Sequence, residues 1–248
     1  MAGKPNVLFL FTDDQRFDTI RALGNRQIHT PNLDYLVRNG IAFTNAYIMG
    51  GTCGAVCMPS RAMMLTGRTL FRIEGEGQRI PTEHTMMPEL FRQAGYATFG
   101  TGKWHNGTAS YARAFTHGAE IFFGGMDDHW NVAACDFDPT GKYPEPRPHP
   151  FPAGPGNWRM AQKRYDHIQR GKHSSELFAD ATREFLLNYD DPEPFFAYVS
   201  FMAPHDPRTM PQEYLTMYDP DAIVLPENYM SEHPFDLSLI HISEPTRP

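Results

Sequence analysis

The sequence lacks the features that mark several classes of protein. Its 248 residues contain three cysteines and no C-x-x-C pair, which argues against a disulfide framework and against a zinc site. The longest apolar runs, such as Val7–Phe11, are far too short to span a bilayer. Lys and Arg number 22 against 29 Asp and Glu, and no basic cluster offsets the formal charge of −7. We therefore expect no nucleic-acid partner and no membrane partner.

What the sequence does contain is typical of an ordinary globular protein. With 41% hydrophobic and 21% charged residues, a chain of this length can bury a full core. Residues 1–5 lead straight into the first apolar run, so we expect no signal peptide in these residues. The sequence leaves the compartment open: cytoplasmic as it stands, periplasmic or secreted if a leader is missing.

Amphipathic segments alternate with short apolar runs. Helices are expected between Thr30 and Gly40, over 85–93 and over 174–189, with Thr30 and either Ser174 or Ser175 as caps. The run at 41–47 predicts a strand.

Two adjacent carboxylates follow the first apolar run. Residues 6–12 predict a buried strand, and Asp13 and Asp14 come directly after it. Ligands gather outside the carboxyl ends of strands in open α/β sheets, and adjacent carboxylates repel unless a cation lies between them. Such oxygens suit calcium or magnesium. A loop with two solvated acids remains the alternative on these residues alone.

The densest pattern is CMPSRAMMLTGR at 57–68. Pro59 suits a first helical turn, so Cys57 is expected at a helix start, beside unpaired backbone N–H groups and the positive dipole end. Arg61, one helical turn on, brings its guanidinium toward the same point. Such a place favours an anion or a nucleophile. A buried cysteine capping an ordinary helix is the alternative, and no bridge from Cys53 to Cys57 is expected.

Two further segments place reactive side chains at predicted strand ends. Residues 96–101 lead into Gly-Lys-Trp-His, where alternation puts Lys103 and His105 on one side. The strand predicted at 194–201 leads to His205, whose flanking prolines restrict the backbone and aim the imidazole. An exposed lysine and structural histidines are the alternatives.

These motifs together resemble those of the type I sulfatases, in the alkaline phosphatase superfamily. The resemblance covers residues 4–236 and lies in Cys-x-Pro-x-Arg at 57–61, Leu-Thr-Gly-Arg at 65–68, Asp-Asp-Gln at 13–15, Gly-Lys-Trp-His at 102–105 and the segment around His205. It implies an α/β fold, a doubly wound and mostly parallel sheet with helices on both faces. It also implies that Cys57 is oxidised to formylglycine by a formylglycine-generating or anaerobic sulfatase-maturing enzyme.

The resemblance further implies a division of roles. Asp13, Asp14 and the modified Cys57 would bind a divalent metal, Ca²⁺ or alternatively Mg²⁺. Arg61 and His105 would orient the formylglycine hydrate, Lys103 would neutralise charge on the sulfate, and His205 would protonate the leaving oxygen. The substrate would be a small-molecule or carbohydrate sulfate ester. A phosphate or phosphonate monoester hydrolase, a catalytically dead binding fragment and a cysteine-protease-like thiol are the competing hypotheses.

Two parts of the chain fall outside this pattern. Residues 124–158 are rich in Gly, Pro, Asp and aromatics, and we interpret them as a long substrate-side loop rather than a metal site at Asp127, Asp128 and His129. Residues 237–248 resemble a translated sequencing adapter, so we assign 1–236 to the front of a catalytic domain and exclude the tail. A second metal-ligand pair and a second lysine would lie further on, so the chain is expected to be inactive alone.

Overall fold

The computed structural model describes residues 3–47, 57–73, 77–154, 157–225 and 229–230. The chain divides into two compact units, one of residues 1–13 and 49–209 and the other of residues 14–48 and 210–248. The predicted adapter-derived tail at 237–248 lies outside the described residues, and so does Cys53. Among the described residues, every helix is too short or too polar to cross a lipid bilayer.

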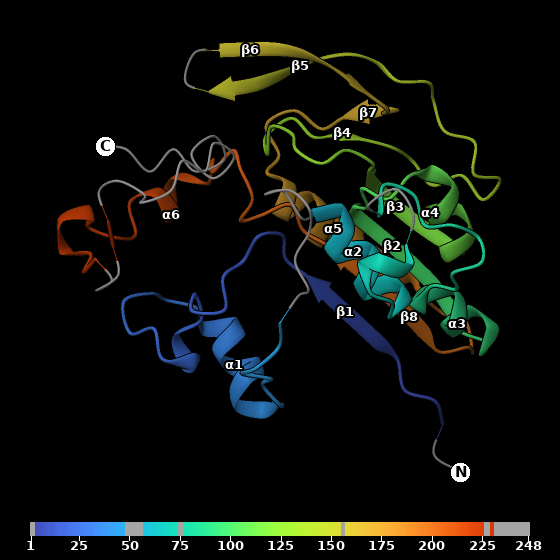
Figure 1. Cartoon of the computed structure of the whole chain (residues 1–248), viewed down its shortest axis with the longest axis horizontal. Coiled ribbons are helices and arrows are strands. Elements are labelled where there is room, and N and C mark those ends of the chain that lie inside the picture. The colour runs from blue at the N-terminus through green and yellow to red at the C-terminus, as the bar shows by residue number, and fades with distance from the viewer. Residues whose placement is uncertain (1–2, 48–56, 74–76, 155–156, 226–228, 231–248) are drawn as a thin grey trace. The chain divides into compact units, whose positions relative to one another are not determined.

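A four-stranded parallel sheet forms the centre of the first unit (Figure 1). Its strand order is β1-β8-β2-β3, and every neighbouring pair is parallel. The strands are β1 (Val7–Phe11), β8 (Phe195–Ser200), β2 (Ala97–Lys103) and β3 (His117–Phe122). The order is not sequential, so the chain crosses over between strands, as a doubly wound sheet requires. The predicted fold class is confirmed.

Helices cover both faces of this sheet. On one face, Phe185 of α5 (Ser174–Asn188) stacks on Phe99 of β2 with ring centroids 4.2 Å apart. On the other, Phe91 of α3 (Met87–Gln93) stacks on Phe196 of β8 at 4.4 Å. Phe196 pairs in register with Thr98, so these two side chains lie on the same face of the sheet. Phe99, the next residue after Thr98, points to the opposite face because side chains alternate along a strand. Helices α2 (Cys57–Thr66) and α4 (Thr108–Ala114) pack on the same side as α3.

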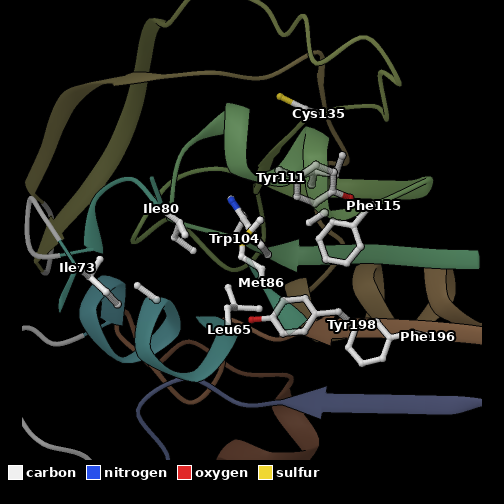
Figure 2. Packing of buried hydrophobic residues seen from close by; sticks show 13 residues of the cluster. Leu65, Ile73, Ile80, Met86, Trp104, Tyr111, Phe115, Cys135, Phe196 and Tyr198 are labelled. Atoms are coloured by element: carbon white, nitrogen blue, oxygen red, sulfur yellow. The ribbon is translucent and has the colours of Figure 1, made fainter. Parts of the chain in front are cut away.

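The larger core lies under α2, α3 and α4. Trp104 is 1% exposed and meets Tyr111 and Phe115 edge-on, each with ring centroids 5.4 Å away. Figure 2 shows Tyr198 and Leu65 completing this aromatic cluster below Trp104. Truncating such a buried aromatic side chain typically costs about 3–5 kcal/mol. Trp104, which directly follows Lys103, is therefore a main anchor of the core.

The remaining elements of the first unit lie outside the four-stranded sheet. They are η2 (Leu70–Arg72), β4 (Ala133–Ala134), β5 (Arg147–Gly154), β6 (Asn157–Lys163) and β7 (His167–Ile168). Strands β4 and β7 pair with each other, and β5 and β6 form an antiparallel hairpin. The expectation of an irregular loop through residue 158 is wrong here. Prolines are tolerated in a strand where their missing N–H would have pointed away from the partner, and Pro148 and Pro150 alternate to satisfy this.

The second unit contains η1 (Arg21–Leu23), α1 (Pro31–Asn39), α6 (Gln212–Leu215) and η4 (Pro220–Ala222). Helix α1 lies where it was predicted, but the Thr30 side chain makes no capping bond and donates to Asp34 instead. The strand expected at 41–47 is absent, and Ile41, Phe43 and Tyr47 are each at least 84% exposed. A β-pattern forms a strand only when another strand offers an edge to pair with, and no strand is described in this unit.

The cap of α5 also differs from expectation. His173, not Ser174 or Ser175, is the N-cap, and its Nδ1 accepts a hydrogen bond from the backbone N–H of Ser175 at 3.2 Å. An imidazole nitrogen without a proton is an acceptor and fills the same role as a serine oxygen. Because serine is a preferred N-cap residue, the sequence alone favours Ser174 or Ser175 over His173.

A bulge in β3 lies beside the end of β2, which carries Lys103. The register with β3 shifts between Thr101 and Gly102, so Glu120 of β3 has no partner residue on β2. The backbone of Glu120 has a φ of 49°. Gly102 has a φ of +83°, and a β-carbon there would lie 1.9 Å from the carbonyl oxygen of Ser200. Bulges turn the following side chains away from the regular alternation. A glycine is therefore required at this point.

We expect Gly102→Ala to lower the free energy of unfolding by about 3 kcal/mol or more, because it adds overpacking to an unfavourable φ. Urea unfolding measures the change. Gly67→Ala is the matched control, since Gly67 also has a positive φ (+64°) but no atom within 4 Å of the added carbon. The control should lose about 1 kcal/mol. Equal losses in the two variants would contradict the backbone clash.

Candidate functional site

The predicted site residues of the first unit meet at the carboxyl ends of its strands. Asp13 follows β1, Lys103 ends β2 and His205 follows β8. Two backbone hydrogen bonds hold the segments after β1 and β8 together, from Phe201 N–H to the Phe11 oxygen at 2.8 Å and from Asp13 N–H to the Ala203 oxygen at 3.3 Å. The parallel topology therefore brings groups that are distant in sequence to one edge.

Asp13 is a buried carboxylate between two cations. The Lys103 ammonium forms an ion pair with its Oδ2, and Nη2 of Arg61 lies 3.5 Å from its Oδ1. The side chains of Lys103 and Arg61 are 0% and 1% exposed, and that of Asp13 is 7% exposed. Buried charges of this kind persist only when they are paired. The three groups form one interdependent unit.

Arg61 is held by one of its terminal nitrogens. Nη1 donates to the carbonyl oxygen of Lys103 at 2.8 Å, the hydroxyl of Tyr198 at 3.2 Å and Oγ of Ser200 at 2.6 Å. The guanidinium also lies over the ring of Phe11, 5.0 Å from its centroid. Its Nε and Nη2 are buried and make no hydrogen bond to any described residue. This edge of the guanidinium faces Asp13, 3.5 Å from Nη2, and keeps N–H groups that could also bind an anionic ligand.

Cys57 and His205 face each other beside Asp13. The possible ligand atoms of Asp13, Cys57 and His205 all lie within 4.8 Å of one another. Nδ1 of His205 donates to the Asp206 carbonyl oxygen at 3.0 Å, which leaves Nε2 for the thiol. Burial opposes ionisation of Cys57, but the His205 hydrogen bond and the Lys103 charge outweigh it and lower the thiol pKa. The same hydrogen bond raises the pKa of His205.

His105 is a neutral imidazole next to these charges. Burial, followed by the charges of Lys103 and Arg61, lowers its pKa from 6.5 to about 3. Its backbone has a φ of 64°, and its ring packs so closely on Gly125 that a β-carbon there would lie 2.4 Å from Cε1. Its buried Nδ1 makes no hydrogen bond to any described residue. A neutral imidazole can orient a ligand hydroxyl without adding charge.

This low pKa makes stability depend on pH. Between pH 6.5 and about 3 the unfolded chain binds a proton at His105 that the folded chain does not, so stability falls as the pH falls through this window. The slope from this group is at most about 1.4 kcal/mol per pH unit. We expect His105→Asn, which tolerates the positive φ, to remove this part of the slope in urea unfolding at pH 7 and pH 5. An unchanged slope would contradict the assignment.

Asp14 is the one predicted site residue outside the first unit. It belongs to the second unit, is exposed and has a φ of 63°. Its role as a metal ligand remains a prediction. Within the first unit, the buried carboxylate of Asp13 suits a hard divalent cation, and an oxygen in place of the Cys57 sulfur would suit it further. The residues present fit part of such a site.

Sequence reasoning missed the side chains that support the site. Tyr198 and Ser200 lie on the same face of β8 and together hold Arg61. Asn106 donates from Nδ2 to the Met58 oxygen at 3.1 Å and also to the Gly77 oxygen, so it ties the segment after Lys103 to the first turn of α2. Tyr198 and Ser200 are two residues apart on a predicted strand, and this spacing could have placed both side chains on one face. Nothing local marked Asn106.

Comparison with known proteins identifies the family of the chain. The Sulfatase family model matches residues 5–231. Mouse arylsulfatase J is 26% identical over 230 residues, covering 87% of this chain and 35% of that protein. Human N-acetylgalactosamine-6-sulfatase is 27% identical over 226 residues, covering 82% of this chain and 40% of that protein. The chain thus spans well under half the length of these relatives.

Solved structures share the fold. A protein crystallised with its substrate D-glucosamine-2-N,6-O-disulfate superposes with a TM-score of 0.56 at 24% identity, covering 82% of this chain and 35% of the other. A phosphonate monoester hydrolase from Silicibacter pomeroyi superposes with a TM-score of 0.56 at 22% identity, covering 90% of this chain and 46% of the other. The same fold therefore accompanies more than one ester chemistry.

Proposed function

Because the chain belongs to the sulfatase family, we propose that it forms part of an enzyme that hydrolyses sulfate monoesters, with carbohydrate sulfates as the substrate class. The observation that carries this proposal is the buried group of Lys103, Arg61 and Asp13 beside Cys57 and His205. The carbohydrate substrate class is supported by the human relative, whose name specifies a sulfated amino sugar.

The two cations supply the sulfate-binding part of the reaction. A sulfate ester carries its charge on oxygens that do not leave, and charge on them changes as the S–O bond breaks. Fixed N–H donors of Lys103 and Arg61 in a site with little water stabilise such charge far better than solvent does. Removal of one such donor typically costs about 10²–10³ in rate.

His205 supplies the proton. Its Nδ1 is engaged with the Asp206 carbonyl oxygen, so Nε2 is the atom that faces residue 57 and the ester bond beside it. A positioned acid of this kind protonates the departing alcohol oxygen. His105, a neutral imidazole, would orient hydroxyl groups at residue 57.

Residue 57 and a divalent cation complete the proposal. A formylglycine produced from Cys57 by a maturing enzyme would supply a hydrated aldehyde as nucleophile. Asp13, with Asp14, would hold Ca²⁺ or Mg²⁺, which would neutralise charge on the sulfate. We expect the 248-residue chain alone to be inactive, since it spans 35–40% of the two relatives.

Two measurements test the proposal. The first is mass spectrometry of the peptide containing residue 57 after co-expression with a formylglycine-generating enzyme, where loss of the thiol and gain of an aldehyde are expected. The second is a paired assay on 4-nitrophenyl sulfate and 4-nitrophenyl phosphate, using the longest protein that contains this chain. Faster cleavage of the sulfate is expected. An intact thiol while a control peptide is oxidised, or preference for the phosphate, would overturn the proposal.

A further inference from the structure

One motif of the sequence is not used by the proposed reaction. His129, in the segment between β3 and β4, is 1% exposed, yet it belongs to no ion pair among the described residues. Its Nε2 lies 3.0 Å from the carbonyl oxygen of His205, and its Nδ1 lies 2.6 Å from Oγ of Ser174. A buried histidine therefore contacts the backbone of the residue that faces Cys57.

The proton positions of His129 follow from its partners. A carbonyl oxygen can only accept, so Nε2 carries the proton and donates to His205. Nδ1 then accepts from the Ser174 hydroxyl, while the Ser174 N–H donates to the carbonyl oxygen of His129 at 2.7 Å. The imidazole is thus fixed by the first residue of α5. With both nitrogens engaged, it has no lone pair for a metal.

A second histidine makes a parallel contact. His173 stacks on His129 with ring centroids 5.2 Å apart and an interplanar angle of 10°. Its Nε2 lies 3.1 Å from the carbonyl oxygen of Thr209, and its Nδ1 accepts from Ser175 N–H. Two stacked imidazoles at the start of α5 therefore hold two carbonyl oxygens of the segment 205–209.

We propose that His129 and His173 form a histidine clamp that holds this segment so that the His205 imidazole faces residue 57. Both are positioning residues, since neither touches residue 57. The geometry distinguishes this role from simple core filling, because the one N–H group of each ring donates to a backbone carbonyl oxygen of the segment 205–209. A core-filling ring would need only its shape, whereas a clamp needs its donor.

The test uses the thiol of the chain produced without a maturing enzyme. Iodoacetamide alkylation of Cys57 at pH 7 is followed by mass spectrometry, with Cys135 as an internal reference because burial raises its pKa to about 12. His129→Phe keeps the ring and loses the donor, and we expect it to slow alkylation about threefold to tenfold because the His205 imidazole no longer faces the thiol. His129→Gln keeps a donor and should retain most of the rate.

A double-mutant comparison shows whether the effect passes through His205. His205→Ala gives the rate without the imidazole, and adding His129→Phe to it should slow alkylation no further. His149→Phe is the matched control, since His149 is 4% exposed but contacts Asp127 rather than the clamped segment. We expect it to leave the rate unchanged. Ser174→Ala, which removes only the bond that orients His129, should give a smaller decrease.

Three results would overturn the clamp. The first is an unchanged rate in His129→Phe. The second is an equal decrease when His205 is already absent. The third is equal decreases in His129→Phe and His129→Gln, which would indicate a loss of shape rather than of a donor. If His129→Phe does not fold, the comparison of His129→Gln with Ser174→Ala decides, because a clamp predicts a slower rate in the latter.

The consequence of the clamp for catalysis depends on the proposed function, but the thiol test does not. In the matured enzyme, we expect His129→Phe to lower kcat for phenyl sulfate more than for 4-nitrophenyl sulfate, with KM nearly unchanged, because only the poorer leaving group needs the acid. If the longest protein that contains this chain has no sulfatase activity after maturation but still shows the His129–His205 coupling, the proposed function is refuted and the clamp stands. Sulfatase activity of that protein without the His129–His205 coupling would refute the clamp and leave the proposed function standing.

Discussion

Replacing Asp13 with Asn is expected to lower the free energy of unfolding by about 3–5 kcal/mol, the range for breaking a buried ion pair. The variant keeps the size and shape of the side chain but removes its charge. Lys103 and Arg61 would then remain buried, with side chains at most 1% exposed and no counter-ion between them. Their mutual repulsion adds to the cost of burying each charge without a partner.

Urea unfolding in a buffer containing a chelator measures this loss without any contribution from a bound cation. Asp14→Asn is the matched control, because Asp14 is exposed, and we expect a change within about 0.5 kcal/mol. Adding Lys103→Met to Asp13→Asn should recover part of the loss, since it removes one of the two stranded charges. A loss below about 1 kcal/mol for Asp13→Asn would show that the three groups are not interdependent.

Replacing His205 with Ala in the matured form of the longest protein that contains this chain is expected to lower kcat for phenyl sulfate by about 10²–10⁴, the usual contribution of a positioned acid. Phenolate is a poor leaving group and needs the proton, whereas 4-nitrophenolate leaves with much less help. The decrease should therefore be far smaller for 4-nitrophenyl sulfate. This prediction depends on the proposed sulfatase activity.

Steady-state kinetics on the two aryl sulfates measure the difference. His117→Ala is the control, because His117 is exposed at the opposite end of β3 and should leave both rates unchanged. Equal decreases on the two substrates would assign His205 to binding or folding instead of proton transfer. Rescue of the slow substrate by added imidazole would support the assignment.

Most of the first unit's architecture was accessible from the sequence, for a physical reason. Buried parallel strands are short continuous apolar runs, and those at residues 6–12 and 194–201 correspond closely to β1 and β8. Polar residues mark where such apolar runs end, and Asp13 and His205 lie in the segments that follow β1 and β8. The failure at 41–47 has the complementary cause, because a strand also needs a partner that its own sequence does not specify.

The supporting contacts of the site were not accessible in the same way. His129 contacts a backbone carbonyl 76 residues away, and Arg61 contacts Ser200 across 139 residues. Carbonyl oxygens carry no sequence signature, so the partner of a buried histidine cannot be identified from local pattern. The chemistry-bearing residues were visible as motifs, whereas the residues that orient them became visible only through tertiary contacts.

The alternating prolines of β5 have a consequence beyond local pairing. Since Pro148 and Pro150 cannot donate, the edge of β5 that faces away from β6 offers an incoming chain few amide hydrogens. Exposed borders with regular donors are templates for edge-to-edge aggregation, and proline is one of the devices that prevents it. The β5 edge of the ribbon is therefore a poor template for a further strand from another molecule.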